Sequence, residues 1–356
     1  MIDNAATVLK VETTELDGLQ DLDIEEVYTH IDVLLSELPG PLDLYQRWER
    51  QQWSASSLDF GIDKVHWDAS GDFLQDQLEQ IFSGFFVGEQ EVTDTLSPLL
   101  MGAPDEHSRW FLSTQVVDEA RHAYFFSRFF SEVIHPGDNH EQVIGRARRH
   151  TDSEAYRGIF GAEGELTKIT EAVRVDPKNY GLWVEGMTTY HLMVEGILAL
   201  VGQRLILRLL RNLDLMPAFR AGFTAVTRDE SRHVNYGIWA LRRAVVDGKE
   251  QHIKAAVDRT LRSCLRIYVN PERLIEIPAD LPPSARIDPR NNWNYAVDSV
   301  SRRLRAAGVD DAYITDVGER AWKIIWEAVG EYEQRQAREH PVREFERAEL
   351  EAASAG

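Results

Sequence analysis

The same five-residue pattern occurs twice in the chain, as Asp-Glu-Ala-Arg-His at 118–122 and as Asp-Glu-Ser-Arg-His at 229–233. In each copy a glutamate and a histidine lie three residues apart, a spacing that places both side chains on one face of a helix. A carboxylate and an imidazole presented together in this way can bind a transition metal. The pairs are Glu119 with His122, and Glu230 with His233.

Each copy is preceded by a second apolar segment that carries one further glutamate. Glu89 falls in helical register with Phe82 and Phe86, and Glu195 lies inside the apolar run 192–200. A buried carboxylate without a partner loses several kcal/mol of solvation, so these two glutamates need a compensating charge. Two helix pairs that each contribute inward glutamates and a Glu-x-x-His pair are the ligand pattern of a two-metal site in a helical bundle.

The predicted site is electrically balanced, because four carboxylates offset two divalent ions while both histidines stay neutral. Without metal, some of these buried carboxylates should take up protons, so metal binding and proton release are linked. Oxygen and nitrogen ligands without a thiolate favour iron or manganese. The six predicted ligands are Glu89, Glu119, His122, Glu195, Glu230 and His233.

The other charged residues of the repeated pattern have two interpretations. Asp118 and Asp229 can orient the ligand histidines. Arg121 and Arg232 either pair with these aspartates or lie on a solvated surface.

A third Glu-x-x-His pair, Glu132 and His135, lacks the flanking Asp and Arg and directly precedes Pro136-Gly137. We interpret it as a solvated helix end, since proline and glycine commonly follow the end of a helix.

Helical periodicity dominates from about residue 72 to 243, and strand-like alternation is rare, so the sequence predicts an all-α protein. A proline-dense connector at 277–289 excludes a continuous helix there. We expect three regions: a flexible acidic N-terminal arm at 1–40, a di-metal domain at 41–269, and a connector with C-terminal helices and a frayed tail at 270–356.

Composition narrows the classes of partner. The net charge of −20, from 39 basic and 59 acidic residues, argues against nucleic acid and against an anionic membrane surface. Cys264 is the only cysteine, which excludes an internal disulfide. With neither a basic-then-apolar leader nor an apolar run long enough for a membrane span, the expected location is cytoplasmic.

Between about residues 44 and 246 the chain resembles the radical-generating small (beta) subunit of class I ribonucleotide reductase and its relatives in the ferritin-like superfamily. The resemblance implies a ferritin-like four-helix bundle core with additional flanking helices, and a homodimer. Within that superfamily the chain is most similar to the ligand-binding oxidases with a mixed manganese–iron site. The segments that carry it are 45–53 (YQRWERQQW), 58–63 (LDFGID), 88–93 (GEQEVT), 189–200 (TYHLMVEGILAL) and 228–233 (RDESRH).

The resemblance also implies the chemistry. Those oxidases form an ether crosslink between a valine three residues after the first metal glutamate and a tyrosine five residues before the third, here Val92 and Tyr190. By this resemblance the chain would hold two metal ions, Mn/Fe or Fe/Fe, activate dioxygen and oxidise unactivated C–H bonds. The implied ligand is a hydrophobic small molecule such as a long-chain fatty acid.

A ribonucleotide reductase small subunit is the first alternative. Its radical tyrosine would fall at Phe126, and no tyrosine follows Tyr332, although that subunit carries one in its C-terminal tail. Trp53 and Asp229, however, match residues that the subunit uses for radical transfer.

Two further alternatives are an iron-storage bundle and a specialised di-iron oxygenase or desaturase. The long N-terminal arm and the helices after residue 290 do not suit a storage cage. His191 is interpreted either as a hydrogen-bond donor near the site or as a satisfied core histidine.

Overall fold

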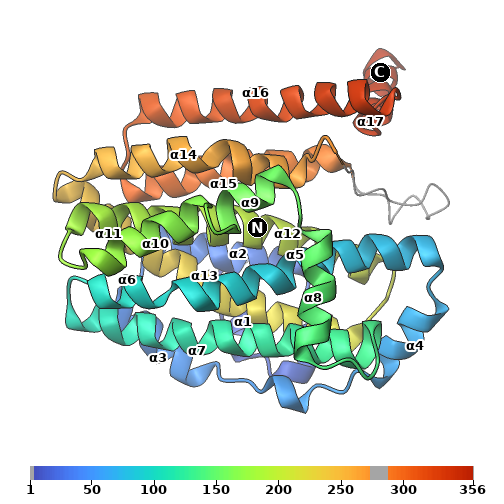
Figure 1. The fold of residues 1–356 in the computed structure, drawn as a ribbon, viewed down its shortest axis with the longest axis horizontal. Coiled ribbons are helices and arrows are strands. Elements are labelled where there is room, and N and C mark those ends of the chain that lie inside the picture. Colours follow the sequence, from blue (N-terminus) through green and yellow to red (C-terminus); the bar gives the residue numbers. More distant parts are fainter. Residues whose placement is uncertain (1–3, 273–287, 356) are drawn as a thin grey trace.

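The computed structural model describes residues 4–272 and 288–355, and every regular element within these ranges is a helix (Figure 1). The predicted all-α class is therefore confirmed. None of these helices is both long and apolar enough to cross a membrane.

The first nine α-helices are α1 (Asn4–Thr13), α2 (Ile24–Glu37), α3 (Pro41–Arg50), α4 (Gly61–Ala69), α5 (Asp72–Thr95), α6 (Ser97–Gly102), α7 (Glu106–Phe129), α8 (His140–His150) and α9 (Glu154–Phe160). The remaining α-helices are α10 (Glu165–Val175), α11 (Tyr180–Met187), α12 (Leu200–Asn212), α13 (Pro217–Val246), α14 (Glu250–Tyr268), α15 (Pro289–Ala307), α16 (Asp311–Gln336) and α17 (Val342–Ala355). Two 3-10 turns, η1 (Leu16–Asp21) and η2 (Ala55–Ser57), and two π-helical segments, η3 (Phe130–Ile134) and η4 (Thr188–Ala199), complete the elements.

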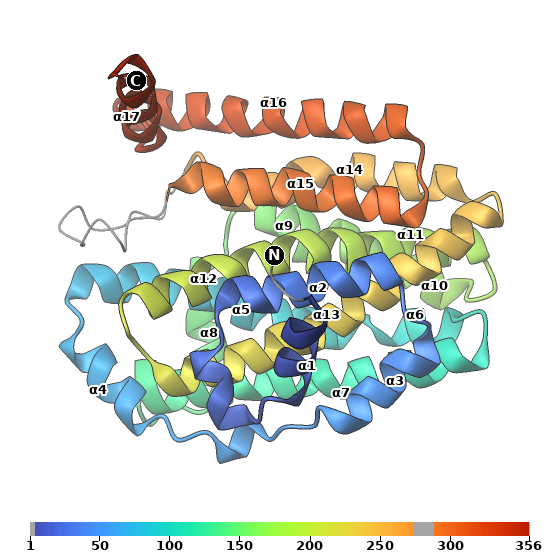
Figure 2. The ribbon, with the colours of Figure 1, turned by 180° about the vertical axis from the view of Figure 1, so that it is seen from behind.

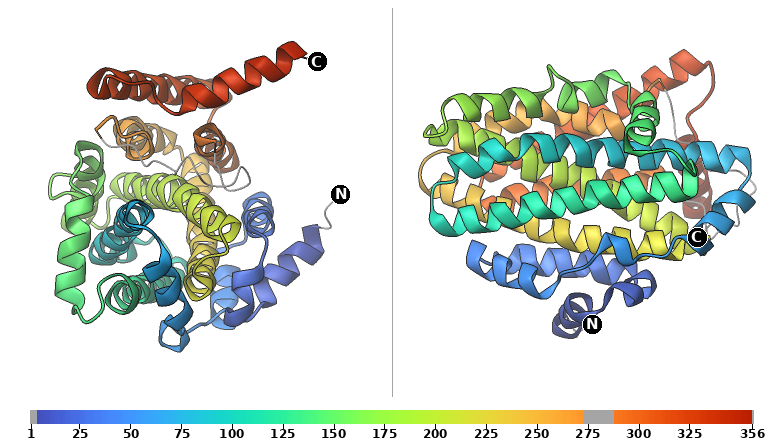
Figure 3. Two further views of the ribbon diagram at one scale, coloured as in Figure 1. Left: turned by 90° about the vertical axis from the view of Figure 1, so that its right-hand side faces the viewer. Right: turned by 60° about the horizontal axis from the view of Figure 1, so that its bottom comes forward.

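Two packed helix pairs form the centre of the molecule. Helix α5 packs against α7, and η4 packs against α13. Further layers cover η4, which contacts α14 and α15, and α16 lies over both of these helices (Figures 1 and 2). Figure 3 shows the bundle from its end, with α16 as the outermost layer beyond α14 and α15. The central pairs carry all six predicted ligands.

The starts of the two ligand-bearing helices are fixed by capping carboxylates. Asp105 accepts a hydrogen bond from the Ser108 backbone N–H at 2.9 Å, which caps α7. Helix α13 begins with Pro217. The free N–H groups of its first turn are capped by a residue distant in sequence, because Asp63 accepts hydrogen bonds from the backbone N–H groups of Ala218 and Phe219 at 3.0 and 2.6 Å. The first cap is local in sequence, whereas the second depends on the tertiary fold.

The segment η4 differs from the regular helix that the sequence predicts. Hydrogen bonds from residue i to i+5 run through Thr188–Ala199. On an α-helix, Tyr190 and Glu195 would point to different faces, because they are five residues apart. The wider π turn rotates them toward a common face, which here is the face that packs on the other helices of the centre.

The N-terminal region is packed, in contrast to the flexible arm expected for residues 1–40. From residue 4 onward it forms α1, η1 and α2, and η1 and α2 both contact α13. Val11 and Leu34 are fully buried. Arg228 of α13 donates to the backbone oxygens of Val11 and Thr14 at 3.4 and 3.1 Å. The acidic composition of this region gave no sign of the apolar side chains that pack on α13, or of the hydrogen bonds from Arg228 that hold the region there.

The C-terminal helices expected after residue 290 are confirmed, since α15 and α16 lie there. The expected frayed tail differs, because residues 342–355 form helix α17. Most of the proline-dense connector, up to residue 287, lies outside the described residues.

Candidate metal centre

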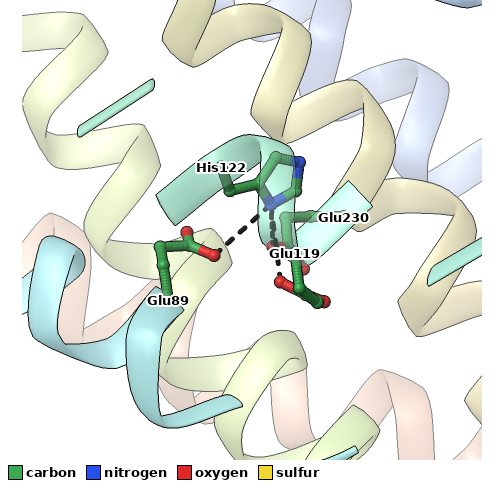
Figure 4. Close-up of side chains that lie close together, drawn as sticks. All are labelled: Glu89, Glu119, His122 and Glu230. Atoms are coloured by element: carbon green, nitrogen blue, oxygen red, sulfur yellow. Dashed lines mark ion pairs between the residues drawn. The ribbon is translucent and has the colours of Figure 1, made fainter. Parts of the chain in front are cut away.

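The six predicted ligands converge in the middle of the bundle, each with 5% or less of its surface exposed. Glu89 comes from α5, Glu195 from η4, and the two Glu-x-x-His pairs come from α7 and α13. Figure 4 shows Glu89, Glu119 and Glu230 around the His122 ring. The structure thus brings together every side chain that sequence spacing selected.

Distances to the histidine nitrogens divide the six residues into two groups that share two carboxylates. His122 Nδ1 lies 3.3 Å from Glu89 Oε2, and His233 Nδ1 lies 3.5 Å from Glu195 Oε1. Glu119 presents Oε2 to His122 at 3.5 Å and Oε1 to His233 at 3.3 Å. Glu230 presents Oε1 to His122 and Oε2 to His233, both at 3.6 Å. One oxygen toward each histidine is the arrangement of a carboxylate that bridges two metal ions.

The inward atoms are the donors that metals would use. Five of them are buried without a hydrogen-bond partner. A buried polar atom that forms no hydrogen bond is costly, so a cluster of such atoms directed at one point is consistent with a site that binds cations. The orphaned atoms are Glu119 Oε2, His122 Nδ1, Glu195 Oε2, Glu230 Oε2 and His233 Nδ1.

The outer nitrogen of each histidine is held by the aspartate of the opposite pattern. His122 Nε2 lies 3.2 Å from Asp229 Oδ2, and His233 Nε2 lies 3.1 Å from Asp118 Oδ2. Donation from Nε2–H to a carboxylate fixes the tautomer that leaves Nδ1 free for a metal. The two copies of the repeated pattern therefore support each other crosswise.

The arginines of the pattern pair with these aspartates. Arg232 has 1% of its side chain exposed, and it donates to Asp229 Oδ1 at 2.6 Å and to Asp118 Oδ2 at 3.1 Å. Arg121 pairs with Asp118 and lies 3.4 Å from Asp229. The interpretation as aspartate partners is confirmed, and these cations offset the charge of two buried carboxylates.

Proton affinities around the centre are strongly perturbed. Burial raises the pKa of Glu89 to about 8 and raises the pKa of Glu195 and Glu230. Burial also acts to raise the pKa of Glu119, but the adjacent His122 and His233 side chains hold this pKa well below its usual range. Without metal, protons therefore reside on some of these carboxylates, and two cations would displace them.

The two residues of the implied crosslink both adjoin the centre. The Tyr190 hydroxyl donates to Glu119 Oε1 at 2.9 Å, and Tyr190 is fully buried. Val92 lies one turn after Glu89 on α5 and is 6% exposed.

A hydrogen-bonded chain that sequence reasoning missed supports Glu195. Gln115 donates to Glu195 Oε1 at 2.6 Å, and His191 Nε2 donates to Gln115 Oε1 at 2.9 Å. Gly237 leaves room for this histidine, because a Cβ atom there would lie 2.2 Å from His191 Cβ. His191 is therefore a buried histidine that donates a hydrogen bond and reaches the centre through Gln115. The available signal was Gln115 itself, a polar residue one turn before Glu119 on an apolar stripe.

Both aspartates also accept hydrogen bonds from tryptophans. Trp53 Nε1 donates to Asp229 Oδ2 and Trp48 Nε1 donates to Asp118 Oδ1, each at 2.8 Å. The sequence singled out Trp53 and missed Trp48.

Other candidate residues lie away from the centre. Phe126 is fully buried among phenylalanines, with its ring 5.7 Å from that of Phe223. The third Glu-x-x-His pair is separate: Glu132 binds Arg128 at 2.7 Å, and His135 binds Glu79 at 2.9 Å. The interpretation of that pair as an ordinary helix end is confirmed.

A cavity of about 350 Å³ opens onto the centre. All four ligand glutamates line it, and its other walls near the centre are mainly apolar. Its outer part carries polar side chains, including Arg149, His150 and Asn270. A volume in this range accommodates a small organic ligand. The apolar walls include Ile81, Phe85, Val92, Phe160, Val194 and Leu198.

The chain resembles known proteins in fold and sequence. It is 25% identical to an R2-like ligand-binding oxidase from Sulfolobus acidocaldarius, with a TM-score of 0.58 over 79% of this chain and 90% of that one. A variant of an R2-like ligand-binding oxidase with an anaerobically reconstituted Mn/Fe cofactor is 20% identical, with a TM-score of 0.55 over 80% of this chain and 93% of that one. These likenesses confirm the ferritin-like bundle with flanking helices.

The sequence also matches the family described as the small chain of ribonucleotide reductase, over residues 36–275. This range contains all six converging ligands and both tryptophan–aspartate pairs. Because the match spans more than half of the 356 residues, the protein belongs to the ribonucleotide reductase small-chain family and is an oxidoreductase with a two-metal site.

Proposed function

We propose that this protein is a dioxygen-activating oxidase of the ligand-binding type, with an Mn/Fe or Fe/Fe cofactor, that oxidises unactivated C–H bonds. The observation that carries this proposal is the cavity, because a largely apolar chamber opens directly onto four buried carboxylates. A storage protein needs no such chamber. The Mn/Fe choice draws on the cofactor of the 20%-identical oxidase variant.

Each half of the centre would hold one ion. Glu89 and His122 would bind the first, Glu195 and His233 the second, and Glu119 and Glu230 would bridge them. When bound, the two ions supply electrons that reduce dioxygen. Asp118 and Asp229 keep the histidine Nδ1 atoms directed inward.

Tyr190 and Val92 are the proposed partners of an ether crosslink. The Tyr190 O–H bond and the Val92 Cβ–H bond would break, and an O–C bond would form between them. The two electrons and two protons released would pass to dioxygen. Glu119, which already accepts the Tyr190 proton in a hydrogen bond of 2.9 Å, is positioned to receive the phenol proton.

The proposed ligand is a hydrophobic molecule with a polar end, of which a long-chain fatty acid is the simplest class. Its apolar part would contact Ile81, Phe85 and Leu198, and its exit would pass the polar groups of Arg149 and Asn270. The enclosed walls exclude water from the reacting carbon.

A radical-generating reductase subunit is the second candidate, and one contact favours it. Trp53, Asp229 and His122 form a continuous hydrogen-bonded chain, with distances of 2.8 and 3.2 Å. Phe126 stands at the position of the radical tyrosine and packs against Phe125 and Phe223, so this position supplies no phenol for a stable radical. A specialised oxygenase or desaturase would use the same centre with a different ligand. The domain limits at residues 40 and 269, the homodimer and the cytoplasmic location stay predictions.

Peptide mass spectrometry tests the proposed function. The protein is loaded with Fe(II) and Mn(II) without oxygen and then exposed to air, while dioxygen consumption is followed. We expect the peptides that contain Val92 and Tyr190 to become joined with the loss of two hydrogens. Tyr190→Phe is the control and should consume dioxygen without forming the joined peptide. Two bound metals with no dioxygen consumption and no joined peptide would overturn the oxidase proposal.

A further inference from the structure

We propose that Trp48 forms a second one-electron path between the metal centre and the protein surface, through which a reductant in solution returns electrons to the centre. This inference rests on the proposed function for its oxidant, the oxidised metal centre. We call the contacts from His233 through Asp118 to Trp48, Tyr45 and Trp110 the Trp48 path.

The inner part of the Trp48 path consists of two hydrogen bonds. His233 Nε2 lies 3.1 Å from Asp118 Oδ2, and the other oxygen of Asp118 accepts the Trp48 indole N–H at 2.8 Å. The Asp118 carboxylate is fully buried. A negative charge held against the indole N–H stabilises an indole that has lost an electron.

The outer part of the path is aromatic and reaches solvent. The ring centroid of Trp48 lies 6.1 Å from that of Tyr45, and Tyr45 lies 6.4 Å from Trp110. Trp110 is 44% exposed. These three rings line one surface hollow together with Ser113, Thr114 and Val117, so a small molecule can contact them directly. Tryptophan and tyrosine side chains are readily oxidised by one electron, and these three rings follow one another in space at the two centroid distances given above.

Among the described residues, Trp53, the counterpart of Trp48 in the other half of the centre, makes no aromatic contact that leads to solvent. It is 8% exposed, and its ring packs against Phe125, which is far harder to oxidise. Two tryptophans with the same hydrogen bond therefore differ in whether an electron can pass outward to solvent.

The proposed step is a simple electron transfer. Trp48 loses one electron to the oxidised metal centre and becomes an indole radical cation, with its N–H still bonded to Asp118. A one-electron reductant such as ascorbate then gives one electron to Trp48, directly or through Trp110, and is itself oxidised by one electron. No bond between heavy atoms forms or breaks.

The first experiment measures reduction by ascorbate of metal-loaded protein that has been oxidised with ferricyanide in the absence of air, followed as Fe(II) captured by a chelator. Rates are expressed per bound iron, since both Trp48→Phe and Trp53→Phe remove a hydrogen bond from an aspartate that orients a ligand histidine. We expect the rate to be lost in Trp48→Phe and retained in Trp53→Phe. Equal rates in the two variants would overturn the Trp48 path. This readout does not need the protein to activate dioxygen, so it separates failure of the path from failure of the proposed function.

The second experiment locates oxidised side chains by peptide mass spectrometry after Fe(II)- and Mn(II)-loaded protein reacts with air in the absence of reductant. If the oxidising equivalent moves outward along the Trp48 path, the ring radical that it forms at Trp110 or Tyr45 should react with dioxygen and leave an oxygenated side chain. Added ascorbate should suppress these products, and Trp48→Phe should abolish them, whereas Trp53→Phe should not. Oxygenated Trp110 in Trp48→Phe at the wild-type level would contradict the path, because it would show damage from solution alone.

Discussion

The two halves of the metal centre have nearly the same ligands and different surroundings. In the first half, Glu89 projects from a regular helix beside Val92 on the cavity wall. In the second, Glu195 projects from a π-helical segment and is fixed by Gln115, which in turn is held by His191. A repeated sequence pattern thus supplies matching side chains to both halves, while the neighbouring helices decide which further contacts each side chain makes. The glutamate of the second half is therefore held by a side chain outside the ligand set.

Removing a bridging carboxylate should have the largest effect. Glu119→Ala and Glu230→Ala each take one oxygen from both halves, so both variants should lose both metals and all oxidase activity. Metal analysis of purified protein checks this. Glu132→Ala is the matched control, because its Glu-x-x-His pair lies outside the centre, and it should keep two metals. Two metals per chain in either bridging variant would refute the ligand assignment.

Replacing either supporting aspartate should weaken metal binding in the half whose histidine lies on the other helix. Asp118→Asn weakens the support of His233, and Asp229→Asn weakens that of His122, although each aspartate lies on the helix of the other histidine. Metal affinity at the affected position should fall about 10- to 100-fold. Competitive chelator titration with spectroscopy of each ion measures this. Loss confined to the histidine on the same helix would break the crossed arrangement.

Metal affinity should depend on pH through the carboxylates whose pKa burial raises. Glu89 has its pKa raised from 4.5 to about 8, so between these values the metal-free folded protein holds a proton that the unfolded chain has released. Glu89 therefore makes the metal-free protein less stable as pH rises through this window, whereas metal binding grows stronger by up to about ten-fold per pH unit for each proton displaced. Calorimetric titrations in buffers of different ionisation enthalpy count the protons. Binding without proton release at pH 6 would contradict the raised pKa.

Gln115→Ala should have the smallest effect and should act on the second half alone. It leaves Glu195 and His191 without their partner, which should lower the free energy of unfolding by about 1–3 kcal/mol. Urea unfolding of metal-free protein measures the change. Metal bound through Glu89 and His122 should be unaffected, and an equal loss at both positions would show that the halves are not independent.

The sequence predicted which side chains converge at the centre because their spacing is local. Glu119 and His122 share a helix face whatever the fold around them, and a lone glutamate such as Glu89 in an apolar stripe needs a cation. The same locality explains why helices were expected after residue 290, where α15 and α16 lie.

What the sequence left open depends on contacts between distant residues. The hydrogen bond between Asp118 and His233 and the capping of α13 by Asp63 each join segments more than a hundred residues apart in sequence. The π turn around Tyr190 has no propensity signature of its own. The N-terminal region was taken for a flexible arm because its acidic residues conceal the apolar face that packs on α13.

Anomalous diffraction from crystals of the protein loaded with manganese and iron, recorded at both absorption edges, tests the central claim most directly. We predict two peaks between Glu119 and Glu230, one against Glu89 and His122 and the other against Glu195 and His233. A single peak, or metal bound away from these six residues, would contradict the account.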